Sequence, residues 1–454
     1  MKKKENTNPL QASSKVSIKI WIPLILFGLI GQVAWTVENM FFNVYVYNTI
    51  TGDPNVIANM VAFSAATATI TTLLMGLLSD RLGKRKIFIC GGYFIWGFTT
   101  LAFAFITVDN TAKLVGAASA VTVTGIIVVV MDCVMTFFGS TANDACFNAW
   151  VTDVTVPEQR GKTESVLSIM PLLGMVVVFG ALAPFTQSNN WKPFFIIVGG
   201  LTTLAGIIGI FLIKDPPQLK PDKGNYFVNI FYGFRPSTVK NNTLLYIAFC
   251  VLAVISMAQQ VYMPYLLIYI QKYLGYENYI PVVAIAGVIA IVANLVLGRL
   301  MDKYGKYKFL IPTTVILALG FLGVYLIRDK GSMIVFGVVG GIMLGAGLLL
   351  AAAVGGIIRD YTPDSKAGQL QGIRIFFSVL IPMVTGPYIG AGVITNTGLT
   401  YEELGQVKPV PTPEIFLASA IVIVFAFIPI AAFLIVRKKK AQQKAADPSQ
   451  TPNV

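Results

Sequence analysis

The chain has 454 residues, of which 55% are hydrophobic and only 12% are charged. Soluble domains usually carry about 25% charged residues, so this composition excludes an ordinary soluble protein. The chain contains no histidine, which excludes metal sites and proton relays built on that residue. Its net charge of +13 raises the question of nucleic-acid binding, which the distribution of the charge answers.

Apolar windows of about 20 residues recur along the whole chain, as they do in polytopic helical membrane proteins. We predict an all-α membrane protein with twelve spanning helices, at residues 20–46, 56–78, 87–107, 114–151, 164–185, 193–213, 241–271, 280–298, 309–327, 332–358, 371–393 and 414–436.

The basic residues are distributed unevenly over the segments that connect these helices. Of the 34 lysines and arginines, 28 lie in the two tails and in alternate loops, and the six others are Lys113, Lys192, Lys272, Arg328, Lys330 and Lys408. The positive-inside rule therefore places both termini in the cytoplasm. We interpret the basic charge as a topology signal, and we predict an inner-membrane protein that does not bind nucleic acid.

The first helix carries Trp35, Glu38, Asn39 and Phe42 at positions i, i+3, i+4 and i+7, which a regular helix places on one face. A charge inside a membrane costs at least ~2.5–3.5 kcal/mol, so Glu38 is a candidate functional residue. Aromatic rings beside an amide suit a sugar, because rings cover its C–H face and polar groups bind its hydroxyls. Packing of the two rings against lipid or a neighbouring helix is the alternative.

The fourth helix carries a second polar stripe, which indicates a hydrated cavity. Its members are Asp132, Thr136, Ser140, Asn143, Asp144 and Phe147, with Asn148 one residue further. Counting residues at 1.5 Å each places Glu38 and Asp132 at similar depth and Asp144 near mid-membrane. Desolvation and a like-charged neighbour favour a neutral, protonated acid, so we predict Glu38 as the proton site and Asp132 as its partner.

The longest polar connection, at residues 214–240, divides the chain into halves. We expect a tail (1–19), a six-helix bundle (20–213), a linker (214–240), a second six-helix bundle (241–436) and a C-terminal tail (437–454). In the seventh helix, Gln259, Gln260 and Tyr265 lie around Pro264, which allows bending, and they are candidate substrate contacts. The tenth helix is rich in Gly and Ala, which fits close helix packing.

The two halves repeat one another. "GLLSDRLGKRK" (76–86) corresponds to "GRLMDKYGKYK" (298–308), and "TDVTVPEQRGKTES" (152–165) corresponds to "RDYTPDSKAGQLQG" (359–372). Matching motifs in corresponding loops indicate a duplicated six-helix unit.

These motifs resemble the signature loops of the major facilitator superfamily. "STANDACFNAWVTD", "FYGFRPS" and "RGKTESVLSIMP" are in turn similar to bacterial sugar transporters related to the glycoside–pentoside–hexuronide:cation symporters. The resemblance implies two six-helix bundles, a cavity lined by helices 1, 4, 7 and 10, and an inner gate that locks the halves together. The residues it assigns to the gate are Gly76, Asp80, Arg81, Gly83, Arg85, Asp153, Arg160, Gly298, Asp302 and Gly305.

We therefore predict a secondary transporter, not an enzyme, that moves a sugar or glycoside with a cation by alternating access. The expected substrate contacts are Trp35, Asn39, Phe42, Asn143, Asn148, Gln259, Gln260 and Tyr265. The expected cation-coupling residues are Glu38, Asp132, Asp144 and Arg374, and Arg374 could pair with Glu164 or Asp144. The coupling ion is H⁺, with Na⁺ as the alternative, and no other cofactor or metal is expected. The partners are a small-molecule substrate and the lipid bilayer, and the protein is a monomer.

One alternative is a proton-coupled exporter of drugs or lipophilic cations, because an acidic, aromatic pocket also suits a cation. A channel is disfavoured by the duplicated gate motifs. An ATP-driven pump is disfavoured because the chain has no G-x-x-x-x-G-K-[ST] nucleotide-binding loop.

Overall fold

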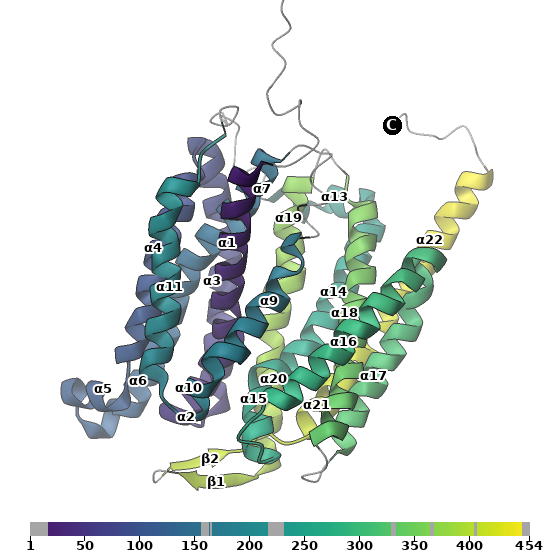
Figure 1. Cartoon of the computed structure of the whole chain (residues 1–454). Helices are drawn as coiled ribbons and strands as arrows, with labels where there is room; N and C mark the ends of the chain where they lie inside the picture. The colour runs from purple at the N-terminus through teal and green to yellow at the C-terminus, as the bar shows by residue number, and fades with distance from the viewer. Residues whose placement is uncertain are drawn as a thin grey trace, which may run out of the picture. The chain divides into compact units, whose positions relative to one another are not determined.

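The structure is a computed structural model of the whole chain. It describes residues 17–155, 163, 166–216, 231–327, 333–363, 367–403 and 406–446. Within these ranges the protein is almost entirely helical, with one short hairpin (Figure 1).

Twelve helical segments in the described residues are long and apolar enough to cross a membrane. Their bounds are Ile18–Thr49, Pro54–Leu82, Lys86–Phe105, Ala117–Val154, Met170–Gln187, Trp191–Leu212, Thr243–Tyr273, Ile280–Met301, Lys306–Leu326, Met333–Tyr361, Gly372–Thr397 and Glu414–Gln443. The prediction of a twelve-helix membrane protein is confirmed.

The chain groups into two compact units. Unit 1 comprises Met1–Gly52 and Ala66–Asn225, and unit 2 comprises Asp53–Ala65 and Tyr226–Val454. The beginning of the second spanning helix thus groups with unit 2, although the sequence places that helix in the first half.

Unit 1 contains ten of the α-helices in the described residues, the third of which it shares with unit 2. They are α1 (Ile18–Thr36), α2 (Phe42–Thr49), α3 (Pro54–Leu82), α4 (Lys86–Ala102), α5 (Val108–Val115), α6 (Ala117–Gly139), α7 (Asn148–Val154), α9 (Met170–Val177), α10 (Ala183–Gln187) and α11 (Trp191–Leu212).

Unit 2 contains the remaining elements. They are α13 (Pro236–Asn241), α14 (Thr243–Tyr262), α15 (Leu266–Ile268), α16 (Ile280–Tyr304), α17 (Leu310–Leu326), α18 (Met333–Tyr361), α19 (Ala367–Ile375), α20 (Ile381–Thr397), β1 (Thr400–Glu403), β2 (Gln406–Pro409), α21 (Glu414–Val424) and α22 (Phe427–Ala446). Short 3₁₀ segments at Phe103–Phe105, Phe231–Phe234, Met263–Tyr265 and Lys306–Phe309 complete the two units.

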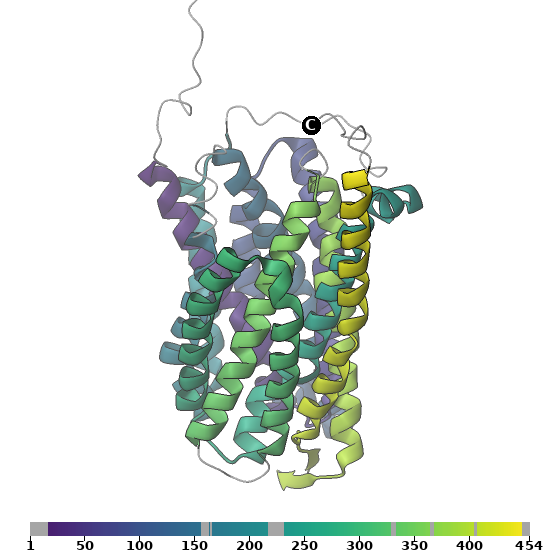
Figure 2. The ribbon, with the colours of Figure 1, turned by 90° about the vertical axis from the view of Figure 1, so that its right-hand side faces the viewer.

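Glycines allow close helix packing in unit 2, as predicted for the tenth helix. A Cβ added at Gly341 of α18 would lie 2.7 Å from Ile289 Cβ of α16, and one at Gly337 would lie 2.9 Å from Ile285 Cβ. Asn294 of α16 also donates a hydrogen bond to the Gly345 carbonyl at 3.0 Å. Figures 1 and 2 show α16, α17 and α18 running side by side.

Within the described residues, five π-helical segments interrupt the spanning helices, at Val37–Phe41, Ser140–Phe147, Val178–Leu182, Tyr269–Tyr273 and Phe376–Leu380. Each extra residue in a turn rotates the side chains that follow it, and such segments often occur at functional sites. The first two contain the acidic residues Glu38 and Asp144, so these acids sit where the helix is irregular.

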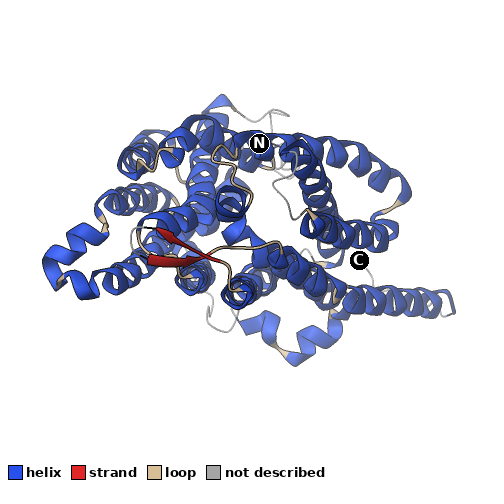
Figure 3. Cartoon of the chain, turned by 90° about the horizontal axis from the view of Figure 1, so that it is seen from below, coloured by secondary structure: helices blue, strands red, loops and turns tan. Residues whose placement is uncertain are grey.

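The connection between α20 and α21 is an antiparallel hairpin, which the sequence analysis did not predict. Tyr401 of β1 pairs with Lys408 of β2, and Figure 3 shows the two strands from below. The linker predicted at residues 214–240 is described only at residues 214–216 and 231–240.

Candidate functional site

A buried polar contact joins the first and fourth spanning helices of unit 1. Glu38 is 8% exposed and Thr136 of α6 is 1% exposed, and the Thr136 hydroxyl donates a hydrogen bond to Glu38 Oε1 at 2.8 Å. Asp132 lies one helical turn before Thr136 and is also 1% exposed. Two carboxyl groups and a hydroxyl therefore occupy one buried region, which we call the acid pair site (Glu38, Asp132 and Thr136).

The π-helical segment Val37–Phe41 changes which faces of the first helix the predicted stripe occupies. Trp35 is half-buried and Asn39 is exposed, whereas Phe42 is 1% exposed and packs against Phe103 and Phe195. The predicted stripe is therefore uneven in exposure, and it contains a π-helical turn that departs from the regular 3.6-residue spacing. Phe42 lies in the aromatic core of unit 1.

Trp35 and Asn143, two of the predicted substrate contacts, lie next to each other. The Trp35 indole N–H donates to Asn143 Oδ1 at 3.3 Å. Asn143 Nδ2 donates to the Tyr93 hydroxyl at 2.6 Å, and that hydroxyl donates to the Phe27 carbonyl at 2.7 Å. This chain of hydrogen bonds fixes the position of the Asn143 amide and, through it, the Trp35 ring.

Gly31 of α1 leaves the space that this chain of hydrogen bonds needs. A Cβ at residue 31 would lie 2.3 Å from Asn143 Nδ2 and 2.6 Å from the Tyr93 hydroxyl oxygen. Both distances are too short for non-bonded atoms, so only glycine allows α1 to approach here.

Asp144 forms a second acidic position, eight residues after Thr136 along the same spanning segment. Ser140 Oγ donates to Asp144 Oδ2 at 3.0 Å, and the exposed Asn148 amide donates to the Asp144 carbonyl at 3.1 Å. At 1.5 Å per residue Asp144 lies ~12 Å from the level of Thr136. It is thus separate from the acid pair site.

In unit 2, the three predicted contacts of the seventh helix point in different directions. Tyr265 is 1% exposed, and its hydroxyl lies 3.1 Å from the Pro54 carbonyl oxygen and 3.0 Å from that of Pro387. A Cβ at Gly347 of α18 would meet Gln259, and one at Gly386 of α20 would meet Gln260. The hydroxyl of Tyr265 is engaged by the backbone, and the two glutamines face α18 and α20 respectively.

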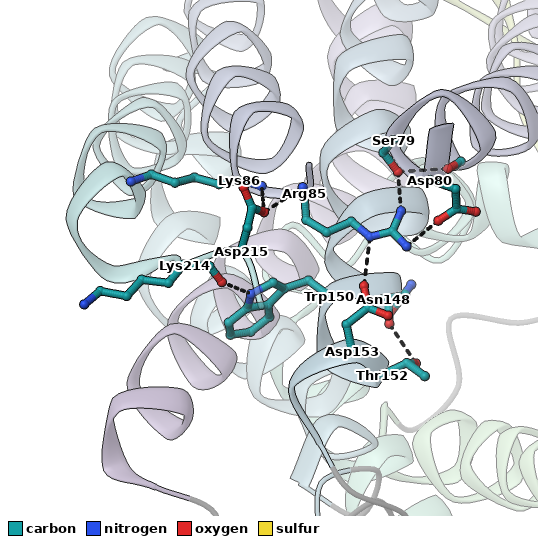
Figure 4. A network of polar contacts seen from close by, with 11 residues as sticks. Ser79, Asp80, Arg85, Lys86, Asn148, Trp150, Thr152, Asp153, Lys214 and Asp215 are labelled. Atoms are coloured by element: carbon teal, nitrogen blue, oxygen red, sulfur yellow. Dashed lines mark hydrogen bonds and ion pairs between the residues drawn. The ribbon is translucent and has the colours of Figure 1, made fainter. Parts of the chain in front are cut away.

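Arg85 organises a charge network at the end of unit 1 where α3 ends (Figure 4). Its guanidinium is buried, pairs with Asp80, bonds Ser79 and donates from Nε to Asp153 Oδ2 at 3.0 Å. Burial disfavours the cation, but the charges of Asp80 and Asp153 outweigh it, so the pKa of Arg85 lies above its ordinary value.

Asp215 stabilises the same region from the end of α11. Its Oδ1 accepts hydrogen bonds from the backbone N–H groups of Arg85 at 2.7 Å and Lys86 at 2.8 Å. These are donors at the beginning of α4, so Asp215 acts as an N-cap supplied from 130 residues away. The sequence analysis did not single out Asp215; an acid directly after the sixth span was the available signal.

The corresponding loop of unit 2 forms an ion pair with different residues. Lys306 Nζ lies 2.6 Å from Asp360 Oδ2 and also donates to the Gly356 carbonyl at 2.9 Å. Asp360 corresponds to Asp153, but Lys306 corresponds to Lys84, while Tyr307 stands where the first half has Arg85. Each unit thus joins its loop to the end of its fourth helix, with the base one position apart.

The remaining predicted gate residues differ in what the structure assigns to them. Gly83 and Gly305 have φ of +62° and +89°, which glycine adopts easily and which end their helices. A Cβ at Gly76 would meet Ala145 Cβ at an ordinary 3.9 Å, and nothing lies within 4 Å of one at Gly298, so close packing does not require glycine at either position. Arg81 and Arg374 are exposed. Arg160, Glu164 and the side chain of Asp302 lie outside the described residues.

The sequence profile of the Major Facilitator Superfamily matches residues 24–351 and 282–452. The chain belongs to the Major Facilitator Superfamily. As a member of this superfamily of transporters, the chain is a multi-pass membrane transporter and not an enzyme.

Solved structures of two transporters share this fold. A variant of the nucleoside transporter NupG has a TM-score of 0.66 and 12% identity, over 92% of this chain and 99% of that chain. A bacterial homologue of the human lysosomal transporter Spinster, inward-facing and occupied, has a TM-score of 0.63 and 14% identity, over 95% of this chain and 98% of that chain. No curated protein matches the sequence. At these identities the likeness concerns the fold, and the narrower resemblance to sugar:cation symporters stays a prediction.

Proposed function

We propose that this superfamily member is a secondary transporter of the inner membrane that moves a sugar or glycoside inward together with a proton. The observation that carries the proposal is the acid pair site. There Glu38 and Asp132 are buried, with exposed fractions of 8% and 1%, and the Thr136 hydroxyl donates to Glu38. Buried acids in a spanning helix are costly and are characteristic of proton or ion pathways.

The acid pair site supports proton coupling because it places two buried carboxyl groups, which can take up and release protons, within spanning helices. Protonation from one side and release to the other would then couple the proton gradient to the conformational cycle. Sodium is the alternative ion, since the same oxygen atoms could bind it.

The substrate half of the proposal rests on Trp35 and Asn143. The Trp35 ring is half-buried and held by the Asn143 amide, and an aromatic face beside an amide suits the C–H face and hydroxyls of a sugar. Exposed amides at Asn39 and Asn148, inside spanning segments, add hydrogen-bonding groups along the same helices. NupG carries nucleosides, which contain a ribose, so nucleosides belong in the substrate panel.

An exporter of lipophilic cations is the second candidate, because two acids and a tryptophan also suit a cation. The neutral amides of Asn39, Asn143 and Asn148 favour the sugar. They can form hydrogen bonds with its hydroxyls, whereas a cation would be bound by the acids alone.

We further propose that the Arg85 network of unit 1 and the Lys306–Asp360 pair of unit 2 belong to the inner gate. Both lie at the ends of spanning helices in the loops that the resemblance assigns to gating. The charge of Arg85 is fixed at physiological pH, so changes in this network would come from movement rather than from loss of a proton.

Uptake by proteoliposomes containing the purified protein tests the function. We expect one member of a panel of sugars, glycosides and nucleosides to accumulate when the outside is acidic, without a requirement for Na⁺. Glu38→Gln should retain exchange of labelled substrate but lose uphill accumulation. Asp109→Asn, an exposed acid of α5, is the matched control and should behave as the parent. Accumulation at the parental level in Glu38→Gln would contradict the proposal, and saturable binding of a lipophilic cation alone would favour the exporter.

A further inference from the structure

A groove of about 390 Å³ lies in unit 1 between the beginning of α1, the end of α11 and α7. Its lining includes Lys19 and Ile22 from α1, Trp150 from α7, and Phe211 and Lys214 at the end of α11. None of these residues belongs to the acid pair site. Figure 4 shows Trp150 and Lys214, whose carbonyl accepts the Trp150 indole N–H at 3.0 Å.

The groove presents two available positive charges. Lys19 and Lys214 are exposed, and neither ammonium forms an ion pair with another residue in the described part of the chain. Asp215 also lines the groove, but its Oδ1 accepts the backbone N–H groups of Arg85 and Lys86. The groove therefore favours an anion over a cation.

The same groove continues into apolar surface. Ile22 is 49% exposed and Phe211 is 78% exposed, and both lie within one turn or so of the ends of spanning segments Ile18–Thr49 and Trp191–Leu212. This position corresponds to the boundary between hydrocarbon and water, where tryptophan is also enriched. A ligand here meets ammonium groups at one end and hydrocarbon at the other.

We propose that this groove binds one anionic phospholipid, with the phosphate between Lys19 and Lys214 and an acyl chain along Ile22 and Phe211. Basic pockets between spanning helices on the cytoplasmic side bind anionic headgroups in this way. The charge distribution of the chain predicts the cytoplasm for this side. The proposal does not depend on which substrate is transported.

The bound lipid would contact the segment that supports the beginning of α4. Lys214 binds Trp150 through its carbonyl, and Asp215 caps α4 through Arg85 and Lys86. A phosphate that holds Lys214 would thus favour the observed position of Asp215.

Native mass spectrometry of the full-length protein tests the proposal with two probes, phosphatidylglycerol and phosphatidylcholine of identical chains. We expect the parent to bind the first more tightly. Lys19→Gln and Lys214→Gln should each weaken phosphatidylglycerol binding about 5-fold, since each basic group near a membrane surface contributes about 1 kcal/mol. Phosphatidylcholine binding should not change. Lys113→Gln with Lys192→Gln removes the same charge from exposed lysines elsewhere in unit 1 and should leave both affinities as in the parent.

Equal affinity of the parent for the two lipids would overturn the proposal, as would a loss of phosphatidylglycerol binding in the Lys113→Gln/Lys192→Gln variant as large as that in Lys19→Gln or Lys214→Gln. Displacement of phosphatidylglycerol by soluble glycerol phosphate would instead identify a simple anion site and would refute the lipid. Brominated phosphatidylglycerol locates the bound lipid independently. It should quench the tryptophan fluorescence of the parent more than that of Trp150→Phe. Equal quenching would place the lipid elsewhere.

Discussion

Thr136 and Glu38 are 98 residues apart in the sequence, and the hydroxyl of one donates to the carboxyl oxygen of the other at 2.8 Å. This contact ties the first spanning helix to the fourth through the group that we propose as the proton carrier. The geometry makes Thr136 a positioning residue for Glu38. The sequence analysis placed Thr136 in the polar stripe of the fourth helix but gave it no role.

Thr136→Val keeps the shape of the side chain but removes the hydroxyl. We expect proton-driven accumulation to fall by about 5-fold or more, because leaving a buried hydrogen-bonding group without its partner typically costs ~1–3 kcal/mol. Substrate exchange, which needs no net proton movement, should change much less. Thr136→Ser retains the hydroxyl and should restore accumulation. Equal accumulation in the valine and serine variants would show that the hydroxyl does not contribute.

Gly31→Ala tests the substrate site without removing any functional group. The new methyl would overlap Asn143 Nδ2 and the Tyr93 hydroxyl, so Trp35 should lose its hydrogen-bonded support. We expect the apparent substrate Kd to rise ~10-fold or more, as for Asn143→Ala. Gly91→Ala, where nothing lies within 4 Å of the added Cβ, is the control and should bind as the parent does. A normal Kd in Gly31→Ala would remove Asn143 from the substrate site.

The seventh helix offers a test that separates binding from stability. Gln260→Ala should raise the apparent substrate Kd by roughly 5- to 150-fold, which corresponds to ~1–3 kcal/mol. Tyr265→Phe should instead lower the melting temperature, because the Pro54 and Pro387 carbonyl oxygens lose a buried donor. Tyr388 is exposed, and its hydroxyl donates to Asn59 Oδ1. Tyr388→Phe should therefore lower the melting temperature less. A raised substrate Kd in Tyr265→Phe with an unchanged melting temperature would instead make Tyr265 a substrate contact.

The inner gate can be tested through Asp80. Asp80→Asn removes one of the two carboxylates that pair with the buried Arg85, so the loop after α3 should open more often. Single cysteines introduced near residues 80 and 302 should react faster with a soluble maleimide in the variant than in the parent. Lys84→Gln changes an exposed charge in the same loop and should leave the rate unchanged. Normal labelling and transport in Asp80→Asn would refute the gating role.

Properties that recur regularly along the sequence were sufficient to predict the architecture. The twelve spans follow from apolar length, and the close packing of α16 and α18 follows from the glycines of the tenth helix. The irregular features were not predictable in the same way. Helical periodicity assumes a constant turn, so it could not predict the π-helical turn at Val37–Phe41. It also did not predict that Phe42, directly after that turn, is buried in the core. Long-range partners such as Asp215 and the α4 backbone also leave no periodic signal.

The two repeated loops have a consequence for the modularity of the protein. Both connect to an acid at the end of the fourth helix of their unit, but the base is Arg85 in one loop and Lys306, one position earlier, in the other. A chimera that exchanges residues 80–86 with 302–308 would keep the sequence pattern and still move the base by one residue relative to its acid. The loops have therefore diverged into parts that are specific to their own half, and their common ancestry no longer makes them interchangeable.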